Sequence, residues 1–223
     1  MKQTMTLLMA LIMVLSLTAC GKTDPASTEE TTVPSTTAAT QPQKEITLTA
    51  QQVGAALKEK LGDSYGCSVP DAEAKTAGYF GLDMEKVDSW MAESHQVSSV
   101  NMDQVVILKV KDGYAQEAAA ALQKGFDQKA GYAQLYDMDL YRISEARLFA
   151  EGNYVALLVI GKPTDPEADP EAQASFAAAE GEKIDAAWEE IFGVKTENIL
   201  VMPEPSENPG GAVPGGVRPR GDR

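Results

Sequence analysis

The clearest chemistry in this 223-residue chain belongs to Cys20, which ends the short stretch LTAC. A basic second residue and an apolar run over residues 5–17 precede this cysteine. The run is shorter than the about 20 residues that a helix needs to cross a bilayer. A cationic start, a short apolar core and small residues at its end are typical of a secretory signal. The sequence therefore predicts export.

The end of this signal, Leu17-Thr18-Ala19-Cys20, has the form of a bacterial lipobox. In a lipobox the cysteine thiol receives a diacylglyceryl group, and cleavage between Ala19 and Cys20 makes the cysteine the first residue. Two acyl chains hold a protein at a bilayer stably, whereas one chain does so only marginally. Ordinary cleavage and an uncleaved anchor helix are the alternatives. We expect a lipid on Cys20 that holds the protein on the extracytoplasmic face of the bacterial cell membrane.

Three carboxylates could supply general acid–base catalysis, because Asp137, Asp139 and Glu145 lie close together in the sequence. Two carboxylates at a suitable separation could make the protein a small cell-envelope hydrolase. The sequence, however, does not give their separation, and no aromatic platform for a sugar accompanies them. No catalytic residue is therefore assigned.

Three tyrosines occupy the same region: Tyr132, Tyr136 and Tyr141. At a spacing of four residues, Tyr132 and Tyr136 would share one face of a helix. Core packing is the default interpretation of such a pair. The functional alternative is a recognition surface for a protein or peptide, because a tyrosine combines an apolar ring with a polar tip.

Metal and triad chemistry find little support. His95 is the single histidine, and histidine-based zinc sites and hydrolytic triads need further partners. The acidic stretch TDPEADPE lacks the glycine turn and distal glutamate of a calcium loop, so we interpret it as a solvated loop with helix-capping acids. Cys67, without a partner once Cys20 carries lipid, is interpreted as a buried small apolar residue. We expect no metal and no cofactor.

Composition limits the partners. The chain has 33 acidic and 19 basic residues and a net charge of −14. Nucleic-acid binders need clustered lysine and arginine, so we expect no nucleic acid. The tripeptide Arg220-Gly221-Asp222 could serve a host-cell adhesin, but three residues often occur together by chance.

The chain divides into four parts by composition. The signal peptide covers residues 1–19, and residues 20–45 form a disordered, lipid-anchored stalk dominated by Thr, Ser, Pro and acids. A globular domain follows over residues 46–201, which is an ordinary domain size. Residues 202–223 are rich in Pro and Gly and are expected to form a disordered tail.

Within the domain, local signals predict helices at both ends. Thr49 and Gln52 form a capping box for a helix that ends at Gly62. Asp169 and Pro170 have the form of the cap and first residue of a last helix, which ends before Gly193. Helical spacing also predicts a short helix over residues 84–94, an alanine-rich helix over residues 115–126, and a helix or turn-rich segment over residues 132–144.

Two hairpins are predicted between these helices. The first joins residues 96–100 and 104–111, and in its second strand Val106, Leu108 and Val110 share a face. The second turns at Gly152-Asn153, and its strand over residues 154–160 is apolar on both faces, as in a central strand. The order of elements predicts an α+β domain with a mainly antiparallel sheet of two hairpins packed by about three helices.

The stretches NMDQVVILKVKDG and RLFAEGNYVALLVIG, with the alanine-rich helix between them, resemble an uncharacterised extracytoplasmic lipoprotein domain of Gram-positive bacteria, the domain of unknown function 4358 family. The resemblance implies a lipobox, a stalk and a single domain, and it implies no known activity. We therefore expect a membrane-anchored lipoprotein that binds a protein, a peptide or a cell-wall component. The hydrolase and the adhesin are the alternatives.

Overall fold

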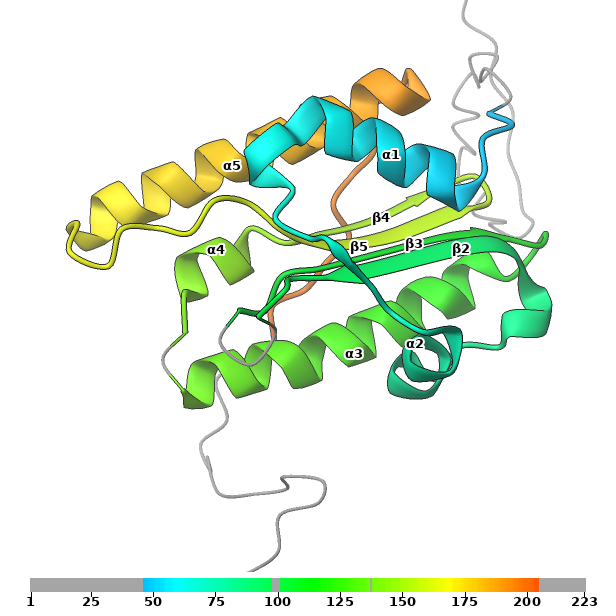
Figure 1. Ribbon diagram of the computed structural model, residues 1–223, viewed down its shortest axis with the longest axis horizontal. Helices are drawn as coiled ribbons and strands as arrows, with labels where there is room; N and C mark the ends of the chain where they lie inside the picture. Colours follow the sequence, from blue (N-terminus) through cyan, green and yellow to red (C-terminus); the bar gives the residue numbers. More distant parts are fainter. Residues whose placement is uncertain (1–45, 98–100, 137, 205–223) are drawn as a thin grey trace, which may run out of the picture. The chain divides into compact units, whose positions relative to one another are not determined.

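A five-stranded antiparallel sheet lies between two layers of helices in the computed structural model, which describes residues 46–97, 101–136 and 138–204 (Figure 1). The helices α1 (Ala50–Leu61) and α5 (Pro170–Phe192) cover one face of the sheet. The helices α2 (Glu73–Phe80) and α3 (Ala115–Leu135) cover the other. The predicted α+β class with a mainly antiparallel sheet is confirmed.

The sheet has the order β1-β2-β3-β5-β4. Its strands are β1 (Val69–Pro70), β2 (Val87–Ser94), β3 (Gln104–Val110), β4 (Arg147–Glu151) and β5 (Tyr154–Val159). The hairpin that turns at Gly152-Asn153 is present as predicted, because β4 and β5 pair on either side of these two residues. The register between β3 and β5 aligns Leu108 with Val155, so two apolar strands lie side by side.

Both faces of the central strands are buried, and this creates two separate cores. Val106, Leu108 and Val110 of β3 pack towards α3, as their predicted common face requires. Val105 and Ile107 point to the opposite face and pack with residues of α1 and α5. Because successive side chains of a strand alternate between faces, the apolar run VVILKV supplies both cores at once.

The predicted helix ends are also confirmed. The hydroxyl of Thr49 accepts a hydrogen bond from the Gln52 backbone N–H, and the Gln52 side chain accepts one from the Thr49 backbone N–H. Asp169 caps the backbone N–H of Ala172 at the start of α5, and Gly193 ends that helix in the left-handed region at φ 71°. These local contacts satisfy groups that every helix end leaves unpaired.

The prediction for residues 84–94 is wrong. Only Met84–Lys86 makes a helical turn, of the 3-10 type, and Val87–Ser94 is strand β2. The spacing of Val87 and Trp90 suggested one helix face, but a register shift after Val87 brings both residues to the α3 side of a strand. Met91 packs on the other side, as strand alternation requires.

The first hairpin is therefore formed by different residues from those predicted. β2, and not residues 96–100, pairs with β3, and residues 98–100 lie outside the described part. The short strand β1 and the helix α2 were not predicted. The segment over residues 132–144 divides between the end of α3 and the short helix α4 (Leu140–Ser144). Three long helices accompany two short ones among the described residues.

The chain after α5 continues along the sheet edge and crosses to α3 (Figure 1). Ile199 donates its backbone N–H to the Leu148 carbonyl of β4, and the Val201 backbone exchanges two hydrogen bonds with Gln123 of α3. Met202, the first residue of the predicted tail, packs against the core on the α3 side. Packing therefore continues slightly beyond the domain end placed at residue 201.

The close approach of α2 to α3 yields the first prediction. A Cβ atom at Gly125 would lie 2.2 Å from the Phe80 ring, whereas a Cβ atom at Gly131 would have no neighbour within 4 Å. We expect Gly125→Ala to lower the free energy of unfolding by about 1–3 kcal/mol through overpacking. Gly131→Ala, the control on the same helix, should raise it by up to about 1 kcal/mol. Urea unfolding measures both, and equal effects would contradict the close packing of α2 on α3.

Candidate functional site

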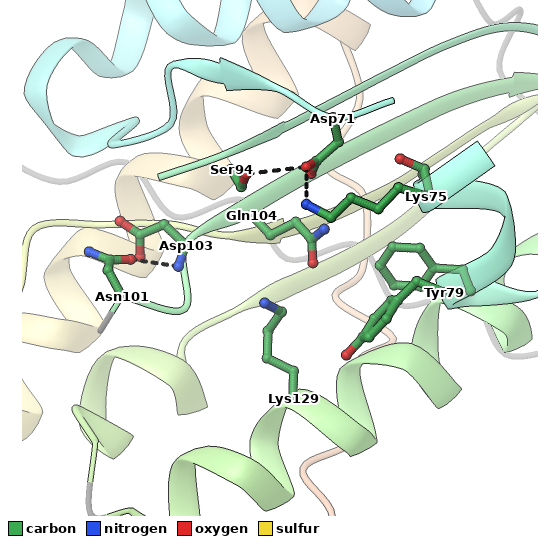
Figure 2. Close-up of a pocket in the computed structure, with 10 residues that line it drawn as sticks. Asp71, Lys75, Tyr79, Ser94, Asn101, Asp103, Gln104 and Lys129 are labelled. Atoms are coloured by element: carbon green, nitrogen blue, oxygen red, sulfur yellow. Dashed lines mark hydrogen bonds and ion pairs between the residues drawn. The ribbon is translucent and has the colours of Figure 1, made fainter. Parts of the chain in front are cut away.

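A polar cavity of about 140 Å³ lies between α2, α3 and the adjoining ends of β2 and β3. Figure 2 shows side chains from all of these elements around it. The residues that matter most for its chemistry are Asp71, Lys75, Thr76, Ser94, Gln104 and Lys129. The other lining residues form parts of its wall: Tyr79, Phe80, Asn101 and Asp103.

Backbone pairing fixes the residues that the sheet contributes. The Asp71 backbone N–H donates to the Ala92 carbonyl at 2.9 Å, which holds the chain after β1 against β2. Ser94 of β2 lies directly opposite Gln104 of β3 in the antiparallel register. Both side chains therefore leave the same face of the sheet and enter the cavity from one side.

Asp71 places a buried carboxylate at the edge of the cavity, with its side chain only 4% exposed. Its Oδ1 accepts a hydrogen bond from the Ser94 hydroxyl at 3.3 Å and pairs with the Lys75 ammonium. Its Oδ2 is buried and has no hydrogen-bond partner among the described residues. A buried charged oxygen without a donor costs free energy, so this atom is an acceptor that the described fold leaves unused.

Two neutral side chains also have a buried polar atom without a hydrogen-bond partner. The Thr76 hydroxyl on α2 and the Gln104 Oε1 on β3 are buried and unpartnered within the part of the chain that the structure describes. A hydroxyl can donate or accept, and an amide presents both an acceptor and two donors. More than nine in ten buried polar groups in folded proteins have a partner. Three such atoms in residues around one cavity are therefore unusual, and folding alone does not account for them.

Lys129 brings a cation to the same space. Its side chain is partly buried on α3 and points into the cavity (Figure 2). No described carboxylate lies within 4.0 Å of its ammonium group. Burial lowers the pKa of Lys129 to about 8; the charge of Lys75 also lowers it, while Cys67 and Asp71 raise it. The site therefore contains a positive charge that lacks a counter-ion.

The second aspartate of the cavity wall is already neutralised. Asp103 forms a buried ion pair with Arg142, and both side chains are at most 5% exposed. Arg142 also pairs with Asp139 at 3.3 Å, and burial lowers the pKa of Arg142. This network joins α4 to the loop before β3 and leaves Asp103 a structural role.

A larger and more apolar cavity of about 450 Å³ lies between α1 and β2, and Asp71 lines it too. Tyr65 and Met91, which pack on the α1 side of the sheet, are among its lining residues. Burial raises the pKa of Tyr65, which lies beside Glu93. Burial also raises the pKa of the nearby Cys67 to about 12. A thiol of that pKa remains protonated at neutral pH, and the expected burial of Cys67 is confirmed.

The carboxylates proposed from the sequence do not form a catalytic pair in the described structure. Asp139 caps α4 and accepts hydrogen bonds from the backbone N–H and the hydroxyl of Thr164. Glu145 pairs with Arg147 at 3.1 Å. Asp137 lies outside the described residues. The described members therefore have structural partners.

Tyr132 of α3 and Tyr136, the residue that caps the end of this helix, lie side by side as predicted. Tyr132 and Tyr136 are 45% and 58% exposed, and their ring centroids lie 4.4 Å apart. Tyr141 is partly buried on α4. The pair is thus on the surface and not in the core, and its role as a recognition surface remains a prediction.

The remaining candidates stay outside this cavity. His95 accepts a hydrogen bond from the Val97 backbone N–H, as a polar loop residue does. The acidic stretch over residues 164–171 caps its own turns, as expected.

Ala19, Cys20 and Arg220–Asp222 lie outside the described residues. Within the described ranges no cluster of metal-ligating side chains is present, and no helix is long and apolar enough to cross a membrane.

The sequence analysis missed the cavity, although the sequence contains its signal. Lys129 follows Leu122 by seven residues and Phe126 by three, which places it on the core-facing stripe of α3. Thr76 precedes the buried Phe80 by four residues on α2, and Gln104 is in phase with Val106 on β3. Each of these polar residues occupies a position that the helix or strand pattern predicts to be apolar. Polar residues at such core-facing positions are typical of functional sites.

Comparison with known proteins adds one match. The family described as Domain of unknown function (DUF4358) matches residues 62–160. This range contains every residue that lines the polar cavity. No curated protein and no solved structure matches the chain.

The uncompensated lysine yields the second prediction. We expect Lys129→Met to raise the free energy of unfolding at pH 7, because it removes a cation whose folded-state pKa is depressed. The full shift would correspond to about 3 kcal/mol, and partial exposure reduces the gain to on the order of 2 kcal/mol. A lowered lysine pKa destabilises the fold fully below pH 8, and this cost disappears as pH rises to the ordinary value of 10.5.

The gain should therefore shrink between pH 8 and pH 10.5. Urea unfolding across this range provides the measurement. Lys124→Met, at an exposed position of the same helix, is the control and should change stability by less than about 0.5 kcal/mol at every pH. If Lys129→Met instead lowers the free energy of unfolding, then contacts within the fold already stabilise the Lys129 charge, and the prediction is wrong.

Proposed function

We propose that this chain, which carries a domain of the DUF4358 family over residues 62–160, is a membrane-anchored extracytoplasmic lipoprotein whose domain binds a small polar ligand. One observation carries the proposed binding activity. Asp71, Thr76 and Gln104 line a cavity that also contains the ammonium group of Lys129, and each of the three has one buried polar atom without a hydrogen-bond partner among the described residues.

These groups oppose folding as long as no donor or acceptor reaches them. Each buried polar atom without a partner costs about 1–3 kcal/mol. A ligand with complementary donors and acceptors would satisfy these atoms together. Because the groups come from α2, β3, α3 and the segment after β1, one folded framework holds them in place before a ligand arrives. Such preorganisation favours binding.

The anchoring part of the proposal rests on the lipobox at Ala19-Cys20 and the apolar run before it. A stalk of residues 20–45 would reach at most about 90 Å when fully extended. It would hold the domain away from the headgroups, where the cavity is open to solutes or to the ends of wall polymers. The membrane contact is the lipid on Cys20.

Binding is favoured over hydrolysis by the contacts of the carboxylates. Asp139 and Glu145 each have an arginine partner, and Asp71 has a lysine partner. Because each of these carboxylates is engaged in an ion pair within the fold, none of them is held ready to take a proton from a substrate. A protein partner remains a second role for the surface that carries Tyr132 and Tyr136, since the two rings are exposed side by side.

The anchor is tested by fractionation. We expect the wild-type protein to sediment with membranes and to gain mass from acyl chains on Cys20. The Cys20→Ala protein should carry no acyl chain, and the Cys67→Ala protein, altered at the buried second cysteine, should remain lipidated and membrane-bound. Mass spectrometry of the intact proteins is the readout. An unmodified Cys20 in the wild-type protein would contradict the anchor.

The binding activity is tested by equilibrium dialysis of the full chain against the low-molecular-weight fraction of a bacterial envelope hydrolysate. We expect the wild-type protein and the Lys124→Met control to retain the same solute, identified by its mass. The double variant Thr76→Val/Lys129→Met should lose at least tenfold in retention, since it removes two of the unpartnered groups. Equal retention by all three proteins, or none by the wild type, would reject the cavity as a binding site.

A further inference from the structure

We infer that the polar cavity recognises an amino-acid unit through its carboxylate and the N–H group on the adjacent carbon. The inference rests on the proposed binding function and names its ligand class. It follows from three properties of the cavity: the charge that remains after all ion pairs are formed, the kind of polar atoms left over, and the available volume.

The charge balance requires an anion. Asp71 is paired with Lys75, and Asp103 is paired with Arg142. These two pairs use both carboxylates that line the cavity, whereas Lys129 has no ion-pair partner among the described residues. A partly buried cation without a counter-ion costs free energy, so the ligand should supply a carboxylate or another anion to Lys129.

The leftover atoms require more than an anion. Asp71 Oδ2 and Gln104 Oε1 are both acceptors, and the carboxylate oxygen is negatively charged. An anion that offers only acceptors could pair with Lys129 and accept from the Gln104 amide N–H, but it would leave the Asp71 and Gln104 oxygens without a donor. A ligand with N–H groups next to its carboxylate would instead donate to them, while the Thr76 hydroxyl can adapt to either neighbour. An α-amino or α-amido carboxylate has this combination.

The volume limits the size of the unit. The cavity measures about 140 Å³, and a cavity of about 150 Å³ in another protein accommodates benzene, a molecule of six carbon atoms. Alanine also has six non-hydrogen atoms. Lys75 is 64% exposed at the rim, so a longer ligand could leave the cavity past this residue. A free small amino acid and the carboxy-terminal residue of a peptide thus share the required chemistry.

The discriminating experiment is isothermal titration calorimetry of the full chain with the Cys20→Ala substitution. The probes are both enantiomers of alanine, alanyl-alanine, propionate, ethylamine and inorganic phosphate. Propionate lacks only the amine of alanine, and ethylamine lacks only its carboxylate. We expect alanine or alanyl-alanine to bind at least tenfold more tightly than these two, because each loses a charge-assisted hydrogen bond.

The comparison of alanine with alanyl-alanine shows whether the ligand is a free amino acid or the end of a peptide. Tighter binding of an alanine enantiomer would identify a free amino acid, and tighter binding of alanyl-alanine would identify a peptide end. Lys129→Met and Asp71→Asn should each weaken the preferred probe at least tenfold. The controls Lys124→Met and Asp88→Asn, at exposed positions of α3 and β2, should leave its affinity unchanged.

The outcomes separate the ligand class from the binding function. Equal affinity for alanine and propionate, or preference for phosphate, would overturn the amino-acid class and retain a binding cavity. Failure of every probe, with a solute still retained in dialysis only when Thr76 and Lys129 are intact, would also overturn the class alone. Failure of every probe together with equal dialysis retention would overturn both. The comparison among probes on the unaltered cavity does not depend on whether a variant folds.

Discussion

The requirement that both faces of β3 and β5 be covered determines most of this structure. All residues of β3 from Val105 to Val110 except Lys109 are fully buried, and every residue of β5 is buried. A single helix layer would leave one of these faces in water. The chain therefore places α1 and α5 on one side and α2 and α3 on the other, and the sheet separates two cores (Figure 1).

The polar cavity interrupts one of these cores. Towards the end of the β2–β3 hairpin, the α3 side of the sheet continues from Val106 to Gln104, and α3 continues from Phe126 to Lys129. Apolar residues at these positions would extend the core and stabilise the fold. The chain has polar groups there instead, and their unsatisfied state lowers stability. Binding sites commonly lower the stability of the free protein in this way, because their polar groups are satisfied only when the ligand is bound.

Sequence patterns sufficed for elements whose signals are local. The capping box at Thr49 and the apolar run of β5 need no knowledge of distant residues. β2 was misassigned because Val87 and Trp90 have helical spacing, and the register shift that explains this spacing exists only in the paired sheet. The cavity as a whole was missed for a similar reason, although three of its polar residues break the local apolar patterns. Its residues lie on four segments, and each single polar residue resembles ordinary variation until the fold brings them together.

The distribution of counter-ions explains why the cavity remains available. Two carboxylates and two lysines line it, so internal pairing could have neutralised every charge. Arg142 prevents this outcome, because it occupies Asp103 with a buried ion pair from outside the lining. Without that arginine, Asp103 would be an unpaired carboxylate in the same cavity as Lys129 and the natural counter-ion for it. The pair between Asp103 and Arg142 thus has two effects: it joins α4 to the loop before β3, and it leaves the Lys129 charge without a carboxylate partner among the described residues, as the proposed binding of an anion requires.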